Sequence, residues 1–350
     1  MADKNLLFDN NEPVIIAGPC AAESRGQLIN TARALSGIPG LRAFRAGIWK
    51  PRTRPGDFEG VGSEGLKWMQ EVKEETGLML AVEVAIPSHV EEAMAAGIDI
   101  VWIGARTVVS PFVVDEIASA LRGSDVYVMV KNPINPDLGL WAGGIERLMK
   151  NNIGKLAAVH RGFDVFYSKP YRNLPFWEIP IELKNSFPEL PILCDPSHIG
   201  GQREFLGRLS QKALDLGMNG LMIESHIDPG KALTDVAQQV SPKELKKIIE
   251  QLIPRKQLGQ ADASLEKFRT SIDELDEQLL EILSKRMEIV SMIGKLKKEQ
   301  NLAPYQAGRW SALLDDRLKK AGSLKLNENF VKKVFETIHM ESIKRQEEPI

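Results

Sequence analysis

The chain has 350 residues, 43% of them hydrophobic and 26% charged, a balance typical of globular proteins with room for two domains. Its formal net charge of −2 argues against nucleic-acid or membrane partners, and two cysteines exclude a disulfide framework. Because the sequence has no apolar run long enough to span a membrane and no signal-peptide core at its N-terminus, we expect a cytoplasmic enzyme.

Eight short apolar segments rich in Val, Ile and Leu alternate with longer amphipathic segments up to residue 253. They lack polar alternation, as is typical of strands buried on both faces of a parallel sheet. The predicted strands cover residues 13–19, 41–47, 78–84, 98–104, 125–131, 155–161, 190–196 and 220–225. Eight strand–helix units predict a (β/α)8 TIM barrel. A doubly wound open sheet is the alternative, but no G-x-G-x-x-G motif follows the first strand.

The character of the sequence changes after residue 253. Residues 254–263 read as a polar linker containing proline and glycine, and residues 264–300 place apolar side chains at the spacing of a long helix. Two shorter helices are predicted near 309–321 and 327–347. The predicted organisation is a barrel domain over 1–253, a linker over 254–263 and an all-α three-helix domain over 264–350.

Residues that carry chemistry in such a barrel stand at the C-terminal ends of the strands. One group there offers a thiol, an imidazole and two carboxylates, which suit a divalent transition metal: Cys20, His198, Glu224 and Asp235. A second group is cationic and consists of Arg45, Lys50, Arg52, Arg106, Lys131 and Arg161. Six cations at one barrel mouth indicate substrates with phosphate and carboxylate groups.

Each of these residues alone has a less specific interpretation. A single cysteine at a strand end is more often a small packed side chain, which is how we interpret Cys194. A single strand-end arginine more often pairs with a carboxylate, and we expect His89 and His339 to be solvated. The metal and anion sites depend on the whole set, because every predicted strand except the third ends in a charge or a metal-ligand type.

Seven motifs follow one another at the predicted strand ends: GPCAAES (18–24), RAGIWKPRT (45–53), GAR (104–106), VK (130–131), HRG (160–162), DPSHIGG (195–201) and LMIESHIDPGKALTD (221–235). Their order and spacing closely resemble the compact type I 3-deoxy-D-arabino-heptulosonate 7-phosphate (DAHP) synthases. The resemblance implies a condensation of phosphoenolpyruvate with erythrose 4-phosphate that releases phosphate.

The resemblance also implies roles for single residues. Cys20, His198, Glu224 and Asp235 match the metal ligands, with Mn²⁺ the expected ion and Zn²⁺, Fe²⁺ or Co²⁺ the alternatives. The phosphoenolpyruvate anchors match Arg106, Lys131 and Arg161, with Arg45 and Lys50 beside them, and the erythrose 4-phosphate site matches Arg52 and Thr53. Crowding by cations should lower the pKa of Lys50 and make it a proton donor or acceptor.

Three positions near the sugar and phosphate sites bear on specificity. Related 3-deoxy-D-manno-octulosonate 8-phosphate synthases usually carry an asparagine where this chain has Pro51-Arg52-Thr53, so this loop favours the four-carbon sugar. The chain departs from its relatives at Asn132-Pro133, where Arg-Gly is frequent, and at Arg54, where a small residue is common.

The last 90 residues carry Arg269, Arg286 and Lys297 within about 120° of one another on a helix, on or beside its apolar face. A cation there needs a partner, since burying it alone is costly. From the residues alone, the simpler interpretation is a coiled-coil dimerisation domain with a solvated polar face.

The segment FRTSIDELDEQLLEILSKRMEIVSMIGKLK (268–297) resembles the first helix of the all-helical chorismate mutases. The resemblance implies that chorismate is held by Arg269, Arg286, Lys297, Arg309, Ser342 and Gln346. Gln306 and Trp310 depart from the family, because acidic residues are common at both positions. The first helices of two chains pair in these mutases, so a homodimer is implied in which Arg269 reaches the partner's site.

Together the two resemblances predict a bifunctional enzyme of the shikimate pathway, in which the barrel makes DAHP and the helical domain converts chorismate to prephenate. We also expect chorismate or prephenate, bound at the helical domain, to inhibit the barrel. The alternative is a barrel synthase whose helical domain only senses a ligand and forms dimers.

Overall fold

A computed structural model of the chain describes residues 7–8, 12–51, 56–166, 169–254 and 263–347. The chain divides into two compact units, residues 1–257 and residues 258–350. Among the described residues, no helix is long and apolar enough to cross a membrane.

The first unit is a closed barrel of eight parallel strands, in which each strand pairs with the next and β8 pairs with β1. The strands are β1 (Val14–Gly18), β2 (Leu41–Ala46), β3 (Met79–Val84), β4 (Ile100–Ile103), β5 (Tyr127–Lys131), β6 (Leu156–His160), β7 (Ile192–Cys194) and β8 (Gly220–Glu224). Every strand lies inside a segment predicted from the sequence. The predicted (β/α)8 barrel is therefore confirmed.

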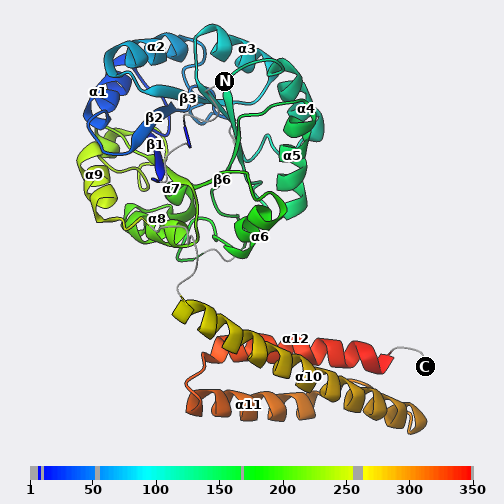
Figure 1. Cartoon of the computed structure of the whole chain (residues 1–350). Coiled ribbons are helices and arrows are strands. Elements are labelled where there is room, and N and C mark those ends of the chain that lie inside the picture. The colour runs from blue at the N-terminus through cyan, green and yellow to red at the C-terminus, as the bar shows by residue number, and fades with distance from the viewer. Residues whose placement is uncertain (1–6, 9–11, 52–55, 167–168, 255–262, 348–350) are drawn as a thin grey trace. The chain divides into compact units, whose positions relative to one another are not determined.

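Helices surround the strands as an outer ring, as Figure 1 shows. They are α1 (Arg25–Leu35), α2 (Glu64–Thr76), α3 (Pro87–Ala95), α4 (Pro111–Ala120), α5 (Leu138–Lys150), α6 (Glu178–Ser186), α8 (Leu206–Asp215) and α9 (Pro242–Gln251). A short helix, α7 (Pro196–Gly200), follows β7 directly. Proline at the first turn of α3, α4, α7 and α9 fits helix starts, because the first backbone N–H groups of a helix have no partner within it.

Alternate residues of each strand build two apolar layers, one under the helices and one inside the barrel. Trp102, Met129 and Met222 are among the side chains that fill the interior. Leu7 packs into the same cluster, and its backbone N–H donates to the hydroxyl of Tyr127 at 3.2 Å. The barrel interior is thus a packed core, which leaves the C-terminal ends of the strands for chemistry.

The alternation of side chains along each strand places charged groups directly above this core. A residue two positions beyond an inward-facing apolar residue also faces inward, because side chains alternate along a strand. The pairs are Ala43 and Arg45, Met129 and Lys131, Val159 and Arg161, Leu193 and Asp195, and Met222 and Glu224. Charges from five strands therefore converge on one layer at the barrel mouth.

His160, at the end of β6, faces the helices instead and is fully buried. Its ring lies 5.3 Å from Trp177, 5.7 Å from Phe163 and 6.3 Å from Trp141, measured between ring centroids. Burial, with the charge of Arg161, lowers the pKa of His160 to about 3. Its imidazole is therefore neutral in the folded protein at pH 7.

We expect His160→Phe to make the barrel less sensitive to acid. In the unfolded chain His160 takes up a proton below its ordinary pKa of 6.5, whereas the folded protein resists protonation down to about 3. The stability from the neutral imidazole is complete above pH 6.5 and is lost as pH falls from there, by up to about 1.4 kcal/mol per pH unit. Thermal unfolding midpoints at pH 7 and pH 5 should differ less in the variant, and an equal drop in both proteins would contradict this.

The second unit contains three helices, α10 (Ala263–Glu299), α11 (Ala307–Ser323) and α12 (Glu328–Glu347), which confirms the predicted all-α region. Helix α12 packs against both α10 and α11. A glycine permits the close approach of α10 and α12, because a Cβ on Gly294 would lie 3.1 Å from the Cα of Gln346.

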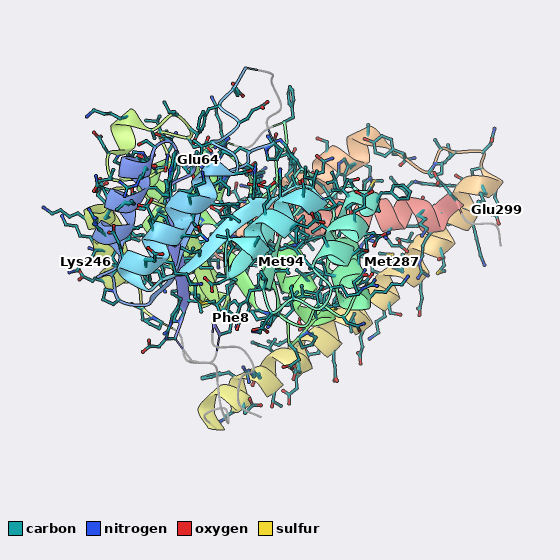
Figure 2. All side chains as sticks on the ribbon, turned by 90° about the horizontal axis from the view of Figure 1, so that it is seen from above. Phe8, Glu64, Met94, Lys246, Met287 and Glu299 are labelled. Atoms are coloured by element: carbon teal, nitrogen blue, oxygen red, sulfur yellow. The ribbon has the colours of Figure 1, made fainter. Side chains whose placement is uncertain are left out.

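The first half of α10 carries a stripe of apolar side chains that are each more than half exposed in the single chain: Phe268, Ile272, Leu275, Leu279, Leu280 and Ile282. Figure 2 shows side chains projecting from α10 on either side of Met287 and as far as its end at Glu299. A helix of 37 residues spans about 55 Å at 1.5 Å per residue. An exposed apolar stripe of this kind is typical of an interaction surface.

Candidate active sites

The barrel mouth brings together three of the four predicted metal ligands. The ligand atoms of Cys20, Glu224 and Asp235 all lie within 4.8 Å of one another. Cys20 follows β1, Glu224 ends β8, and Gly18 pairs directly with Glu224 across the two strands. One carboxylate oxygen of Glu224, Oε1, is buried and accepts no hydrogen bond from the described residues. A buried carboxylate oxygen without a hydrogen bond fits a cation site.

His198 completes the set from helix α7. Its Nε2 lies 3.8 Å from Oε1 of Glu224, while its Nδ1 lies 2.8 Å from Oδ2 of Asp195. Burial lowers the pKa of His198, so its ring is neutral at pH 7. With the proton on Nδ1, shared with Asp195, Nε2 can bind a metal, which is the usual carboxylate–histidine–metal arrangement.

The electrostatics of Cys20 also suit a metal ligand. Burial, with the charge of Glu224, raises the pKa of its thiol to about 12. The charges of Lys50 and Arg45 work to lower this pKa but do not offset burial, so a thiolate at neutral pH needs a further cation, which a bound metal ion would supply. The donor set of sulfur, imidazole nitrogen and carboxylate oxygens fits a borderline divalent metal such as Mn²⁺, Zn²⁺, Fe²⁺ or Co²⁺.

Lys50 lies directly beside this cluster. Its Nζ donates to Sγ of Cys20 at 2.8 Å and to the carbonyl of Cys20 at 3.0 Å. The lowered pKa expected for Lys50 is wrong. Burial works to lower the pKa of Lys50, but its interactions with Cys20 and Glu224 outweigh burial and the repulsion of Arg45, and they raise the pKa. Lys50 is therefore protonated at pH 7.

Arg45 lies beneath the cluster and is almost fully buried. Its Nη2 donates to the carbonyl of Cys20 at 3.0 Å, and its Nη1 lies 3.3 Å from Oε1 of Glu224. The guanidinium also rests 4.8 Å above the ring centre of Trp102, and Nζ of Lys131 lies 5.7 Å from the same ring. Trp102 thus forms an aromatic floor under two cations of the site.

Lys131 is the last residue of β5, and Arg161 directly follows the neighbouring strand β6. Lys131 donates to Oδ2 of Asp195 at 2.8 Å, and Arg161 donates to Oδ1 of Asn173 at 2.8 Å. Burial lowers the pKa of Arg161 to about 10, and the charges of Arg172 and Arg106 act in the same direction. Arg161 keeps its charge at pH 7. Arg106 is exposed, and its charge acts on Arg161, whereas Lys131 and Arg161 are both buried at this place.

Of the two departures from the related enzymes, the structure describes the one at Asn132-Pro133. Asn132 is fully buried; its Oδ1 accepts from the backbone N–H of Arg161 at 2.6 Å, and its Nδ2 donates to the carbonyl of Gly162 at 2.8 Å. This departure therefore holds the chain of Arg161 in place. Arg52, Thr53 and the departure at Arg54 lie outside the described residues.

Several residues that orient the ligands have no predicted role in the sequence. Asp195 joins Lys131 to His198; burial opposes its ionisation, but His198 and Lys131 hold the pKa of Asp195 well below its ordinary value. Gln239 accepts from the backbone N–H of Cys20 at 2.9 Å, and the adjacent Gln238 donates to Oε2 of Glu224 at 2.6 Å. Both glutamines are buried. The one sequence signal for them is a Gln-Gln pair shortly after Asp235, which is weak alone.

The helical unit gathers part of its own predicted set. Arg286 on α10 donates to the hydroxyl of Ser342 on α12 at 2.6 Å. Lys297 donates to the carbonyl of Pro304 at 2.6 Å, and Oε1 of Gln346 is buried without a hydrogen bond from the described residues. Burial, together with the charge of Arg317, lowers the pKa of Arg286. Arg286 and Lys297 both act on His339, and two cations in one neighbourhood suit an anionic ligand.

Among the described residues, Arg269 and Arg309 make no hydrogen bond or ion pair with this group, and both are exposed. Arg269 pairs with Glu266 at 2.6 Å on its own helix. It lies 17 residues before Arg286, which corresponds to about 25 Å along α10. Arg269 therefore cannot share a small ligand with Arg286 of the same chain.

The expectation that His89 and His339 are solvated is wrong. The ring of His89 stacks on Trp49, with 4.1 Å between ring centroids and planes 4° apart, and burial lowers the pKa of His89.

His339 is partly buried in the helical unit. Its ring stacks on Trp310, with 4.0 Å between ring centroids and planes 8° apart, and its Nε2 is buried. Burial and the charges of Arg286 and Lys297 lower the pKa of His339. The aromatic residue at 310 therefore has a structural partner on α12. Cys194, by contrast, is buried in the outer core as predicted.

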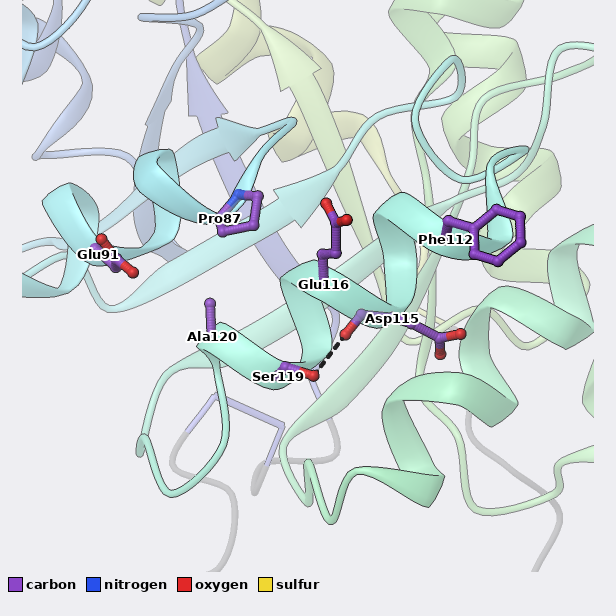
Figure 3. A pocket seen from close by; sticks show the side chains of 7 residues that line it. All are labelled: Pro87, Glu91, Phe112, Asp115, Glu116, Ser119 and Ala120. Atoms are coloured by element: carbon purple, nitrogen blue, oxygen red, sulfur yellow. Dashed lines mark hydrogen bonds between the residues drawn. The ribbon is translucent and has the colours of Figure 1, made fainter.

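A separate hollow of about 470 Å³ lies between α3 and α4 on the outside of the barrel. Figure 3 shows Phe112 at its edge beside Asp115 and Glu116 of the same helix. The side chain of Phe112 is 84% exposed. None of the predicted site residues lines this hollow.

Comparison with known proteins gives a match for each unit. Residues 3–260 match the family model described as "DAHP synthetase I family", and residues 268–347 match "Chorismate mutase type II". A curated "Phospho-2-dehydro-3-deoxyheptonate aldolase" of Thermotoga maritima is 32% identical over 248 residues, 71% of each chain. A "2-dehydro-3-deoxyphosphooctonate aldolase" of Syntrophotalea carbinolica is 27% identical over 269 residues, covering 71% of this chain and 93% of the relative.

Solved structures agree with the match of the first unit. The crystal structure of a Thermotoga maritima "Phospho-2-dehydro-3-deoxyheptonate aldolase (DAHP synthase)" superimposes with a TM-score of 0.63 at 30% identity, covering 69% of this chain and 68% of that one. A truncated form of "3-deoxy-D-arabino-heptulosonate 7-phosphate synthase" from the same organism gives 0.60 at 27% identity, covering 69% and 85%.

Proposed function

This chain belongs to the DAHP synthetase I family and carries a chorismate mutase type II domain, and from that premise we propose a metal-dependent, feedback-regulated bifunctional enzyme. The barrel condenses phosphoenolpyruvate with erythrose 4-phosphate to DAHP and phosphate, and the helical domain converts chorismate to prephenate. We assign residues 1–253 to the synthase, 254–263 to the linker and 264–350 to the mutase. The observation that carries the synthase proposal is the Cys20, Glu224 and Asp235 cluster beside buried cations.

In the proposed synthase reaction, Cys20, His198, Glu224 and Asp235 hold the metal, which supplies Lewis-acid polarisation of the aldehyde when bound. Arg106, Lys131 and Arg161 bind the phosphate and carboxylate of phosphoenolpyruvate, with Arg45 supporting the floor. We assign Arg52 and Thr53 to erythrose 4-phosphate, since the KPRT sequence favours the four-carbon sugar. Lys50, protonated and 2.8 Å from Cys20, donates a proton during the condensation.

Metal removal is the experiment that tests the synthase proposal. After exhaustive chelation, we expect synthase activity to fall to background, because the sulfur and carboxylate ligands hold the ion that activates the aldehyde. Adding Mn²⁺ should restore it, and mutase activity, measured as chorismate loss on the same samples, should not change. Full synthase activity in protein shown by elemental analysis to be metal-free would contradict metal dependence.

A thiol that must stay reduced to bind metal also favours a cytoplasmic location.

The proposed mutase site lies between α10 and α12. The reaction is a unimolecular rearrangement, so the site has to hold the compact conformer and stabilise charge on the breaking C–O bond. Arg286 and Arg309 bind carboxylates together with Ser342, and Lys297 and Gln346 serve the ether oxygen. Lys297 supplies a cationic donor for this oxygen, and Gln346 donates through Nε2, which in the single chain donates to the carbonyl of Ser342 at 3.1 Å.

We further propose that the helical domain forms a homodimer with a second copy of this chain. Support comes from the exposed apolar stripe on the first half of α10, which a paired α10 would cover. Support also comes from Arg269, which lies too far from Arg286 of its own chain to serve the same ligand. In the dimer, Arg269 reaches the site of the partner subunit.

Feedback inhibition through the helical domain gives a direct prediction. We expect saturating prephenate to lower the synthase rate of the full chain, because a ligand bound by Arg286 and Ser342 orders the domain attached to the barrel. The Arg286→Ala variant should keep its synthase rate in the presence of prephenate. An unchanged wild-type rate at saturating prephenate would refute the regulation.

The alternative is that the helical domain only binds a ligand and forms dimers. The observation in its favour is the replacement of common acidic residues by Gln306 and Trp310, the latter stacked on His339. Chorismate loss catalysed by the wild-type chain, and abolished in Arg286→Ala, separates a mutase from a binding module.

A further inference from the structure

Arg172 and Asn173 lie in the loop between β6 and α6, and their backbone is fixed against α7. Both N–H groups donate to the carbonyl of Ile199 at 3.1 Å. Two glycines permit this approach: a Cβ on Gly201 would lie 2.4 Å from the Cβ of Arg172, and one on Gly162 would lie 2.9 Å from the Cβ of Asn173. Both glycines have positive φ, +67° and +76°, which other residues rarely adopt. The dipeptide is therefore held in one place.

Arg172 controls the orientation of Asp235. Its Nη1 donates to Oδ1 of Asp235 at 2.9 Å and to Oε1 of Gln238 at 2.7 Å. The other oxygen of Asp235, Oδ2, accepts from Sγ of Cys20 at 3.2 Å. The backbone of Asp235 has a φ of +50°, an unfavourable region for a residue with a side chain. Contacts from outside its own turn are needed to hold Asp235 there.

Asn173 connects a cation to a metal-ligand helix. Its Oδ1 accepts from Nη1 of Arg161 at 2.8 Å, and its Nδ2 donates to the carbonyl of His198 at 2.6 Å. Asn173 is buried, so these bonds are shielded from competing water. Adjacent side chains of one loop thus contact Asp235 on one side and Arg161 with His198 on the other.

We propose that Arg172 and Asn173 form a positioning unit that makes metal binding and phosphoenolpyruvate binding favour one another. Arg172 directs Oδ2 of Asp235 toward the other ligands, and Asn173 fixes Arg161 relative to His198. This inference rests on the proposed metal and phosphoenolpyruvate sites. Partners that orient metal ligands typically contribute 10- to 100-fold to metal affinity.

A second effect of Arg172 acts in the opposite direction, because its positive charge repels a nearby metal ion. The two effects have opposite signs when the arginine is removed. Positioning predicts weaker metal binding in Arg172→Met, whereas charge repulsion predicts tighter binding. Side-chain exposure of 46% favours positioning, because solvent screens the charge of Arg172 more than it weakens a short hydrogen bond to Asp235.

The first test measures Mn²⁺ binding to the full chain by titration calorimetry. We expect Arg172→Met to weaken binding by about 10- to 100-fold and Arg172→Lys, which keeps a donor near Asp235, to recover part of the loss. Arg33→Met is the matched control, because it removes an arginine paired with Glu75 on the outer helices. Wild-type or tighter binding by Arg172→Met overturns the proposal. Mutase activity of each variant reports whether the rest of the chain is intact.

The second test measures the linkage between the two ligands. In the wild type, Mn²⁺ should tighten phosphoenolpyruvate binding, and phosphoenolpyruvate should tighten Mn²⁺ binding by the same factor. Asn173→Ala should weaken phosphoenolpyruvate binding and bring this factor close to one. An undiminished factor in a variant that binds both ligands overturns the coupling. Failure of the wild-type chain to bind Mn²⁺ would instead count against the proposed synthase site itself.

Discussion

Cys20→Ser should greatly weaken metal binding and remove synthase activity at ordinary Mn²⁺ concentrations, while the mutase reaction continues unchanged. Serine keeps the size of the side chain, but its hydroxyl does not ionise beside a metal as a thiol does, so the cluster with Glu224 and Asp235 loses its sulfur ligand. We expect Mn²⁺ affinity to fall about 100-fold or more, at the upper end of what changes around metal sites produce. Titration calorimetry and paired assays of the two reactions measure this.

The second cysteine provides a matched control for this experiment. Cys194 is also fully buried, but it packs in the outer core beneath the helices. Cys194→Ser should therefore cost some stability and leave Mn²⁺ affinity unchanged. If both variants lose metal equally, or if Cys20→Ser binds Mn²⁺ like the wild type, the thiol of Cys20 is not a ligand.

Arg286→Ala should lower the mutase rate about 100- to 1000-fold, the range found when one donor to a charged transition state is removed. The reason is the position of Arg286 against Ser342 on α12, beside Lys297 and His339. Synthase activity without prephenate should be unaffected. Chorismate consumption measured by absorbance decides the result, and a rate within threefold of the wild type would remove Arg286 from the site.

Mixing the Arg269→Ala and Arg286→Ala variants tests whether the mutase site is shared between two chains. Arg269→Ala should also be inactive as a mutase, because Arg269 completes the site of the partner subunit. In an equal mixture that exchanges chains, half of the dimers are mixed and one of their two sites holds both arginines, so about a quarter of the wild-type activity should return. No recovery in a mixture shown by mass spectrometry to contain mixed dimers would place both arginines in one chain.

The strand period explains why so much of the barrel site could be predicted. Arg45, Lys131 and Glu224 each stand two residues beyond an apolar side chain of the inner layer, so their convergence follows from the alternation of side chains. The metal-ligand types at strands one, seven and eight were visible for the same reason. The helical unit was similarly clear, because the three- and four-residue spacing marks its helices.

Other features depend on contacts between distant loops and have no local pattern. The roles of Gln238, Gln239 and Arg172 come from side chains that reach across the barrel mouth to Glu224, Cys20 and Asp235. The pKa of Lys50 was mispredicted because the sequence shows the crowd of cations but not the distance of 2.8 Å to Cys20. His339 was misjudged because its stacking on Trp310 joins two separate helices.

The aromatic floor of Trp102 has a consequence for the direction from which substrates enter. Below Trp102, apolar side chains of the described residues fill the barrel down to Leu7. In the proposed reaction, both substrates therefore reach the site from the C-terminal ends of the strands, on the side of Trp102 that Arg45 and Lys131 occupy.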